Sequence, residues 1–132
     1  MRLLLDTHCW LWMLAAPERF SASALALLED RRNELLLSAA SSWEIAIKYA
    51  LGRLPLPAPP AEYVPQRMRS SGVLALAVEH AHALRVAALP PHHADPFDRL
   101  LVAQAILEGL PILTVDRQLE AYGVELVWAA GS

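Results

Sequence analysis

Cysteine and long apolar runs are both scarce in this sequence. Its 132 residues include a single cysteine, Cys9, so the chain has no internal disulfide framework and no metal site built from cysteines alone. A single cysteine is consistent with a protein of a reducing compartment. No apolar run approaches the roughly 18 consecutive residues that suggest a membrane span. We therefore expect a cytoplasmic protein without a membrane partner.

A surplus of positive charge is also missing. Lysine and arginine total 11 against 14 acidic residues, which leaves a formal net charge of −3. Proteins that bind nucleic acid through a basic surface gain affinity by releasing counterions from phosphates, and this sequence offers no such surplus. The balance still permits a metal-dependent nuclease, because bound divalent cations are the largest local charges in such a site.

The first 16 residues resemble a signal peptide only superficially. Arg2 precedes apolar residues, but Asp6 and His8 interrupt the segment that would have to be uncharged. With 55% hydrophobic and 19% charged residues, the chain is typical of a globular protein. Its length suits one hydrophobic core, so we expect a single domain over residues 1–132.

Short apolar runs alternate with segments of helical spacing along the chain. Strands are expected over residues 2–5, 35–38, 73–78, 111–115 and 124–128, the last at an edge of the sheet. Helices are expected over residues 8–15, 43–51, 62–71, 79–88 and 96–108, and the helix at 43–51 is expected to have its cap at Ser41 or Ser42. A further helix is expected from a cap at Ser21 or Ser23 to the charged residues 29–32, which we expect to form a solvated surface. Five prolines between residues 55 and 65 indicate a stiff surface connector. The alternation predicts an α/β fold with a mostly parallel central sheet of four to five strands and helices on both faces.

The stretch with the clearest local pattern is the predicted helix start Asp95-Pro96-Phe97-Asp98. Asp95 suits the N-cap, Pro96 suits the first helical position, and Asp98 lies where a carboxylate favours the positive end of the helix dipole. Acids in a first helical turn are also common capping devices. The stretch alone therefore does not separate a cap from a working carboxylate.

Four acids are expected at one edge of the sheet. Asp6 and Asp116 each follow a strand, while Glu44 and Asp98 are expected in the first turns of helices that begin at the same edge. Sites in parallel sheets form outside the carboxyl ends of the strands. One such acid is more often structural, but four acids placed alike indicate a site.

Clustered carboxylates repel one another and raise their pKa values unless a cation neutralises them. Ligands that are all oxygen suit Mg²⁺ or Mn²⁺, with positions left for water and a substrate phosphate. A metal held this way can activate water for attack on a phosphodiester. This chemistry is hydrolytic and needs no protein nucleophile.

Several neighbours of the acids allow two interpretations. Lys48, the only lysine, and Arg99 would either hold a phosphate or pair with a carboxylate, and pairing is the simpler expectation. His93 would contact phosphate or donate to Asp98, although a histidine before a helix is more often structural. Thr114, beside an acid, would orient water or metal, or only satisfy the backbone.

Four blocks of this sequence resemble those of PIN domains, and more narrowly those of VapC-type toxins of bacterial type II toxin–antitoxin pairs. The blocks are residues 4–8 (Leu-Leu-Asp-Thr-His), 43–48 (Trp-Glu-Ile-Ala-Ile-Lys), 93–105, which opens His-Ala-Asp-Pro-Phe-Asp-Arg, and 113–116 (Leu-Thr-Val-Asp). They occur in the right order and span almost the whole chain. The block that opens at His93 is the most specific.

The resemblance implies an endoribonuclease that depends on Mg²⁺ or Mn²⁺ and halts growth by cutting RNA, with transfer RNA among the candidate substrates. It also implies a cognate VapB-type antitoxin and a homodimer. The residues that match the family's catalytic and metal-binding acids are Asp6, Glu44, Asp98 and Asp116. Asp95 is left as a helix cap, with a further role near the metal open.

Other functions remain as alternatives. A PIN-type nuclease that matures RNA without being a toxin, an inactive PIN-like binding module and a receiver-like signalling module would all keep acids at this edge. A receiver normally has adjacent acids and a lysine after a late strand, whereas here the four candidate acids are dispersed and the only lysine, Lys48, comes early. The four tryptophans would pack in the core or in part anchor an antitoxin or dimer contact, in which case Trp12→Ala would weaken antitoxin binding without unfolding.

Overall fold

The computed structural model describes residues 1–130, and its five strands form one parallel sheet with the order β3-β2-β1-β4-β5. The strands are β1 (Arg2–Leu5), β2 (Glu34–Ser38), β3 (Leu74–Leu76), β4 (Ile112–Thr114) and β5 (Leu126–Trp128). Each lies within or beside a range expected from the sequence, and β5 is at an edge, as predicted. The predicted α/β fold with a parallel sheet is confirmed.

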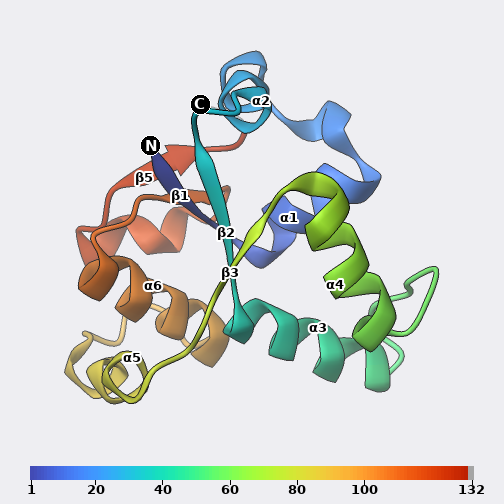
Figure 1. Ribbon diagram of the computed structural model, residues 1–132. Helices are drawn as coiled ribbons and strands as arrows, with labels where there is room; N and C mark the ends of the chain where they lie inside the picture. Colours follow the sequence, from blue (N-terminus) through green and yellow to red (C-terminus); the bar gives the residue numbers. More distant parts are fainter. Residues whose placement is uncertain (131–132) are drawn as a thin grey trace.

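Helices follow the strands on both faces of this sheet (Figure 1). They are α1 (Thr7–Ala15), α2 (Ala22–Glu29), α3 (Ala39–Ala50), α4 (Pro60–Ser71), α5 (His80–Arg85) and α6 (Pro96–Glu108), with 3₁₀ helices η1 (Pro17–Arg19), η2 (Val86–Ala88) and η3 (Arg117–Tyr122). Among residues 1–130, no helix has the length and apolar character needed to cross a membrane.

Two apolar clusters lie on opposite faces of the sheet, because side chains alternate along β1. Leu3 and Leu5 pack with Trp10 of α1, in the cluster that also receives α2 and α4. Leu4 packs on the other face with Leu101 of α6. All three leucines are fully buried, as expected for a central strand that is covered twice. β1 is the central strand and pairs in parallel with β4, so the carboxyl ends of these two strands lie side by side at one edge of the sheet.

The expected cap of α3 was wrong. Ser38, at the end of β2, is the N-cap, and its hydroxyl accepts from the amide of Ala40 at 3.0 Å. The helix starts at Ala39, so Ser41 and Ser42 lie inside it. Ser38 is buried at the junction of strand and helix, where no loop intervenes, and this abrupt change hid the boundary in the sequence.

The proline-rich connector is shorter than expected. Its second half is helical, since α4 begins at Pro60, and Pro65 lies inside the helix. Pro60 is at the first helical position, where its fixed φ is favourable and no amide donor is needed.

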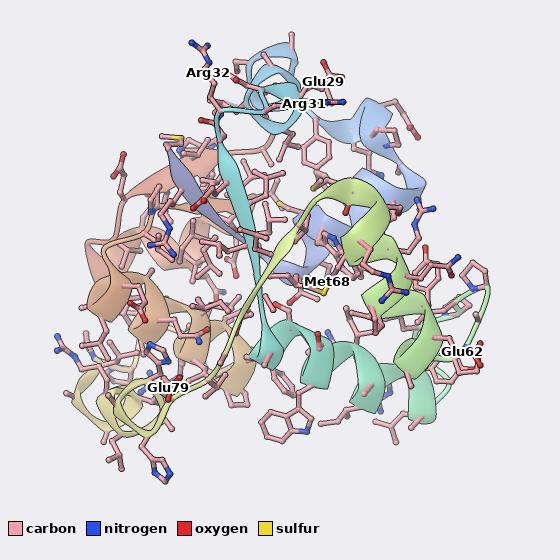
Figure 2. All side chains as sticks on the ribbon, viewed as in Figure 1. Glu29, Arg31, Arg32, Glu62, Met68 and Glu79 are labelled. Carbon is pink, nitrogen blue, oxygen red and sulfur yellow. The ribbon has the colours of Figure 1, made fainter. Side chains whose placement is uncertain are left out.

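The charged residues at the end of α2 form a solvated surface, as predicted. Figure 2 shows Glu29, Arg31 and Arg32 around the end of α2, and Arg32 pairs with Asp30 at 2.9 Å. This end of the molecule is opposite the carboxyl ends of the strands.

Candidate active site

All four predicted acids lie at the carboxyl edge of the sheet, and two of them, Asp6 and Asp116, are helix N-caps. Asp6 follows β1 and accepts from the amide of His8 at 3.2 Å, and Asp116 follows β4 and accepts from the amide of Gln118 at 2.9 Å. Asp98 is in the first turn of α6. Glu44 is in the second turn of α3 and not the first, because that helix starts earlier than expected.

Asp98 and Asp116 are joined by His93. The Nε2 atom of His93 is 2.7 Å from Asp116 Oδ2 and 3.2 Å from Asp98 Oδ2. Since the amide of Asp95 donates to Nδ1 at 3.1 Å, Nε2 carries the hydrogen that Asp116 accepts. Within residues 1–130, these three form the group of potential metal ligands whose ligand atoms all lie within 4.8 Å of one another. The role of His93 was left open from the sequence; the structure places its Nε2 atom between Asp98 and Asp116, and its place in the most specific sequence block was the available signal.

Asp6 is tied to the same cluster through Thr114. The Thr114 hydroxyl donates to Asp6 Oδ2 at 2.6 Å and accepts from the amide of Asp116 at 3.0 Å. Burial alone would raise the pKa of Asp6, but hydrogen bonds from His8 and Thr114 outweigh it and hold the pKa below its usual value. Asp6 is therefore an ionised carboxylate in a buried position.

The pKa of Asp98 is shifted in the opposite direction to that of Asp6. Burial, and then the negative charges of Asp6 and Asp95, raise its pKa from 3.8 to about 7; Glu44 adds a smaller push, while His93 acts against the rise. These influences require the carboxylates to lie close together, since charge interactions weaken with distance. The cluster is thus electrostatically strained in the absence of a cation.

Glu44 has one paired and one unpaired oxygen. Its side chain is 2% exposed, and Oε2 accepts from Lys48 Nζ at 2.6 Å, which confirms the expected pairing of Lys48. Its Oε1 is buried without a hydrogen-bond partner among the described residues. Such an oxygen is costly to bury unless something compensates it. Together with the raised pKa of Asp98, it fits a hard divalent cation, for which carboxylate oxygens are the preferred ligands.

The expected pairing of Arg99 with a carboxylate was wrong. Its guanidinium donates to the carbonyls of Pro90 and Val86, each at 3.1 Å, and to the Tyr122 hydroxyl at 3.3 Å. The same hydroxyl accepts from the amide of His93 at 2.9 Å. Arg99 therefore holds the loop that carries His93 toward the acids.

A buried glutamine connects the two helices that carry Glu44 and Asp98. Gln104 of α6 is fully buried, accepts from the Ser38 hydroxyl at the start of α3, and donates to the carbonyl of Ala77 at 3.1 Å. Figure 1 shows α3 and the start of α6 close beside each other below the sheet. This buried polar contact therefore ties α6, which carries Asp98, to the start of α3, which carries Glu44.

Comparison with known proteins agrees with this geometry. Residues 3–125 match the PIN domain family. The chain belongs to the PIN domain family. Ribonuclease VapC22 of Mycobacterium tuberculosis is 32% identical over 120 residues, which is 90% of this PIN domain chain and 90% of the relative. Ribonuclease VapC16 of the same organism is 61% identical over 57 residues, but this match spans 43% of the present chain and only 40% of VapC16.

Solved structures share the PIN domain fold at low sequence identity. In VapBC2 from Rickettsia felis bound to a promoter DNA fragment, the match has a TM-score of 0.69 and 13% identity, and covers 96% of this chain and 98% of the other. In DNA-bound VapBC from Salmonella typhimurium, the TM-score is 0.66 with 17% identity, and the match covers 96% and 97% of the two chains. These likenesses show the fold.

Proposed function

We propose that this PIN domain protein is a metal-dependent endoribonuclease of the VapC type, the toxin of a toxin–antitoxin pair. The observations that support the proposal are the close group of Asp98, Asp116 and His93, the effect of the charges of Asp6 and Glu44 on Asp98, and the Oε1 atom of Glu44, which is buried without a hydrogen-bond partner among the described residues. The names of the two ribonuclease relatives support RNA as the substrate, and the VapBC complexes of similar fold support a VapB-type antitoxin as the partner. We further propose one domain over residues 1–132, a homodimer and a cytoplasmic site of action.

Within this proposal, Asp6 and Asp98 hold Mg²⁺ or Mn²⁺, and Glu44 and Asp116 complete the ligand set. When bound, such an ion supplies a Lewis acid that lowers the pKa of water and stabilises charge on a phosphodiester. Thr114 fixes the orientation of Asp6 and keeps it ionised.

The residues around the acids have separate tasks in the proposal. His93 holds Asp116 in place, and Lys48 balances one oxygen of Glu44 so that the other is left for the ion. Asp95 caps α6 and adds negative charge next to Asp98.

The first test is cleavage of a mixed RNA pool, transfer RNAs included, by protein freed of its partner, in Mg²⁺, Mn²⁺ or EDTA. Wild-type protein should cut RNA only with a divalent ion. The cleavage rate of Asp98→Asn should be at least about a hundredfold lower, which is the usual loss when a group that stabilises the transition state is removed. The matched control is Asp30→Asn, which removes an equal charge from the distant surface beside Arg32 and should keep full activity. Equal cutting by wild type and Asp98→Asn, or no cutting with any metal, would contradict the proposal.

Expression without the partner separates a toxin from a nuclease that matures RNA. A toxin should arrest growth, and Asp6→Asn should relieve the arrest because it removes the ionised carboxylate at the end of β1. Normal growth with active wild-type enzyme present would favour the processing role.

A further inference from the structure

Trp43 is the one aromatic side chain among the large apolar residues that are exposed in the part of the chain the structure describes. It is 58% exposed, whereas Trp10 is fully buried. Trp12 and Trp128 are half-buried, and each stacks with an arginine, Arg19 and Arg117 respectively. No cation among the described residues stacks on the Trp43 ring, so its exposure needs an explanation other than core packing or a cation–π contact.

A second aromatic ring holds this indole in place. Trp43 and Phe97 meet edge to face, with ring centroids 5.1 Å apart and an interplanar angle of 78°. Phe97 is half-buried at the start of α6, so the contact joins α6 to α3. Because an edge-to-face contact uses one ring edge, the indole is oriented while most of its surface remains open to solvent.

Both rings are next to proposed ligands in the sequence. Trp43 precedes Glu44, and Phe97 precedes Asp98. Consecutive residues on a helix point about 100° apart, so an inward Glu44 leaves Trp43 on the adjoining flank of α3. The aromatic pair therefore lies beside the edge at which the acids gather.

We propose that Trp43 stacks on a nucleobase of the RNA, next to the phosphate that is cut. This inference rests on the proposed ribonuclease function and assigns a substrate contact to it. The protein has a net charge of −3 and an acidic site, so contacts that do not depend on charge must contribute to binding RNA. Stacking on an aromatic ring is such a contact, and it selects single-stranded RNA, whose bases are free to leave the stack.

A lasting protein contact at Trp43 fits the structure less well. Trp43 directly precedes Glu44, so a second copy of the chain seated on this indole would compete with RNA for the surface beside the acids. A partner there would act by blocking the site, and the experiment separates that outcome from base stacking.

The test uses a single-stranded RNA oligonucleotide that contains the cleavage site mapped in the pool experiment, and matched versions with one abasic position beside the cut. Trp43→Ala should raise KM for the intact RNA about tenfold with little change in kcat, as expected for the loss of one stacked base. One abasic position should raise the KM of wild-type protein by a similar factor. The same abasic position should not raise the KM of Trp43→Ala any further. The KM of Trp43→Phe for the intact RNA should lie between those of wild type and Trp43→Ala. Leu84→Ala, which removes a 74% exposed side chain from α5, is the control and should match wild type.

A second readout needs no cleavage. In the Asp98→Asn background, added RNA should quench tryptophan fluorescence, and Trp43→Phe should abolish that quenching. The proposal is overturned if wild type cuts RNA while the effects of Trp43→Ala and of the abasic position simply multiply, or if Trp43→Ala alters only the oligomeric state or only the affinity for the antitoxin. If wild type neither cuts nor binds RNA with any metal, the ribonuclease function itself fails and this inference fails with it.

Discussion

At the scale of single residues, Asp98 is the group whose protonation reports on the site. Its pKa of about 7 in the metal-free protein results from burial and from neighbouring negative charge. A carboxyl with a raised folded-state pKa weakens the fold as pH rises, because the unfolded chain ionises near 3.8 while the folded protein resists ionisation up to about 7.

We therefore expect metal-free wild-type protein to lose stability between about pH 4 and pH 7, and Asp98→Asn to lose less. At about pH 8 the variant should be the more stable of the two, by up to about 4 kcal/mol, since each pKa unit corresponds to about 1.36 kcal/mol. At about pH 4 the two proteins should be close to equal. Urea unfolding in EDTA across this range measures the difference, and parallel pH profiles would contradict the assignment.

Residue roles were predictable from the sequence where a local rule applied. Lys48 pairs with Glu44 because they are four residues apart on one helix. The pairing expected for Arg99 was wrong, because its guanidinium bonds to the carbonyl of Pro90 and the hydroxyl of Tyr122. The role of His93 stayed open because its contact with Asp116 joins segments that no local spacing relates.

At the scale of elements, the entry to α6 combines two functions in Asp95. Its carboxylate accepts from the amides of Phe97 and Asp98, at 2.8 and 3.3 Å, and its charge also raises the pKa of Asp98. The cap needs an oxygen acceptor, whereas the effect on pKa needs the negative charge. Substitutions can separate the two.

We expect Asp95→Ala to lower the free energy of unfolding by about 1 kcal/mol, the usual loss for a removed N-cap. Asp95→Asn keeps an acceptor, so its stability should stay within a few tenths of a kcal/mol of wild type or exceed it, because asparagine caps about as well as aspartate. The pKa of Asp98 should fall in both variants, which NMR titration of the carboxyl carbon would measure. An equal loss of stability in both variants would mean that the charge, and not the acceptor, supports the helix.

The same element shows why some boundaries could be predicted and others could not. Asp95, Pro96 and Gly109 mark the limits of α6, since each acts within one turn of the helix end, and Gly109 has the positive φ of 64° that glycine adopts without strain. The start of α3 carried no comparable mark. Ser38 ends a strand and caps a helix at once, and only the packed structure separates these roles.

At the scale of the whole molecule, the sheet order brings together acids that are far apart in sequence. The alternation of strands and helices predicted the parallel sheet, and the rule that sites form at carboxyl ends predicted the edge. Side-chain contacts within that edge were not predictable in this way, because they depend on the strand order β3-β2-β1-β4-β5 and on the depth to which each acid is buried.

Since the cluster is strained without a cation, divalent ions should stabilise the entire fold. We expect Mn²⁺ or Mg²⁺ to raise the melting temperature over that in EDTA by about 10 °C near saturation, because an ion at a hundred times its Kd adds about 2.7 kcal/mol. Asp6→Asn and Asp98→Asn should lose most of this rise, whereas Asp30→Asn should keep it. A similar rise in all four proteins would place ion binding elsewhere on the surface. Differential scanning fluorimetry provides the measurement.

The position of β4 between β1 and β5 also affects the timing of activity during synthesis. β1 is made before its neighbour β4 and before Asp116, the acid that follows β4. Until they emerge, one side of β1 has no strand beside it, and Thr114 is not there to hold Asp6. A nascent chain that stops before β4 therefore carries no assembled site, and the activity that we propose begins only after β4 has joined the sheet.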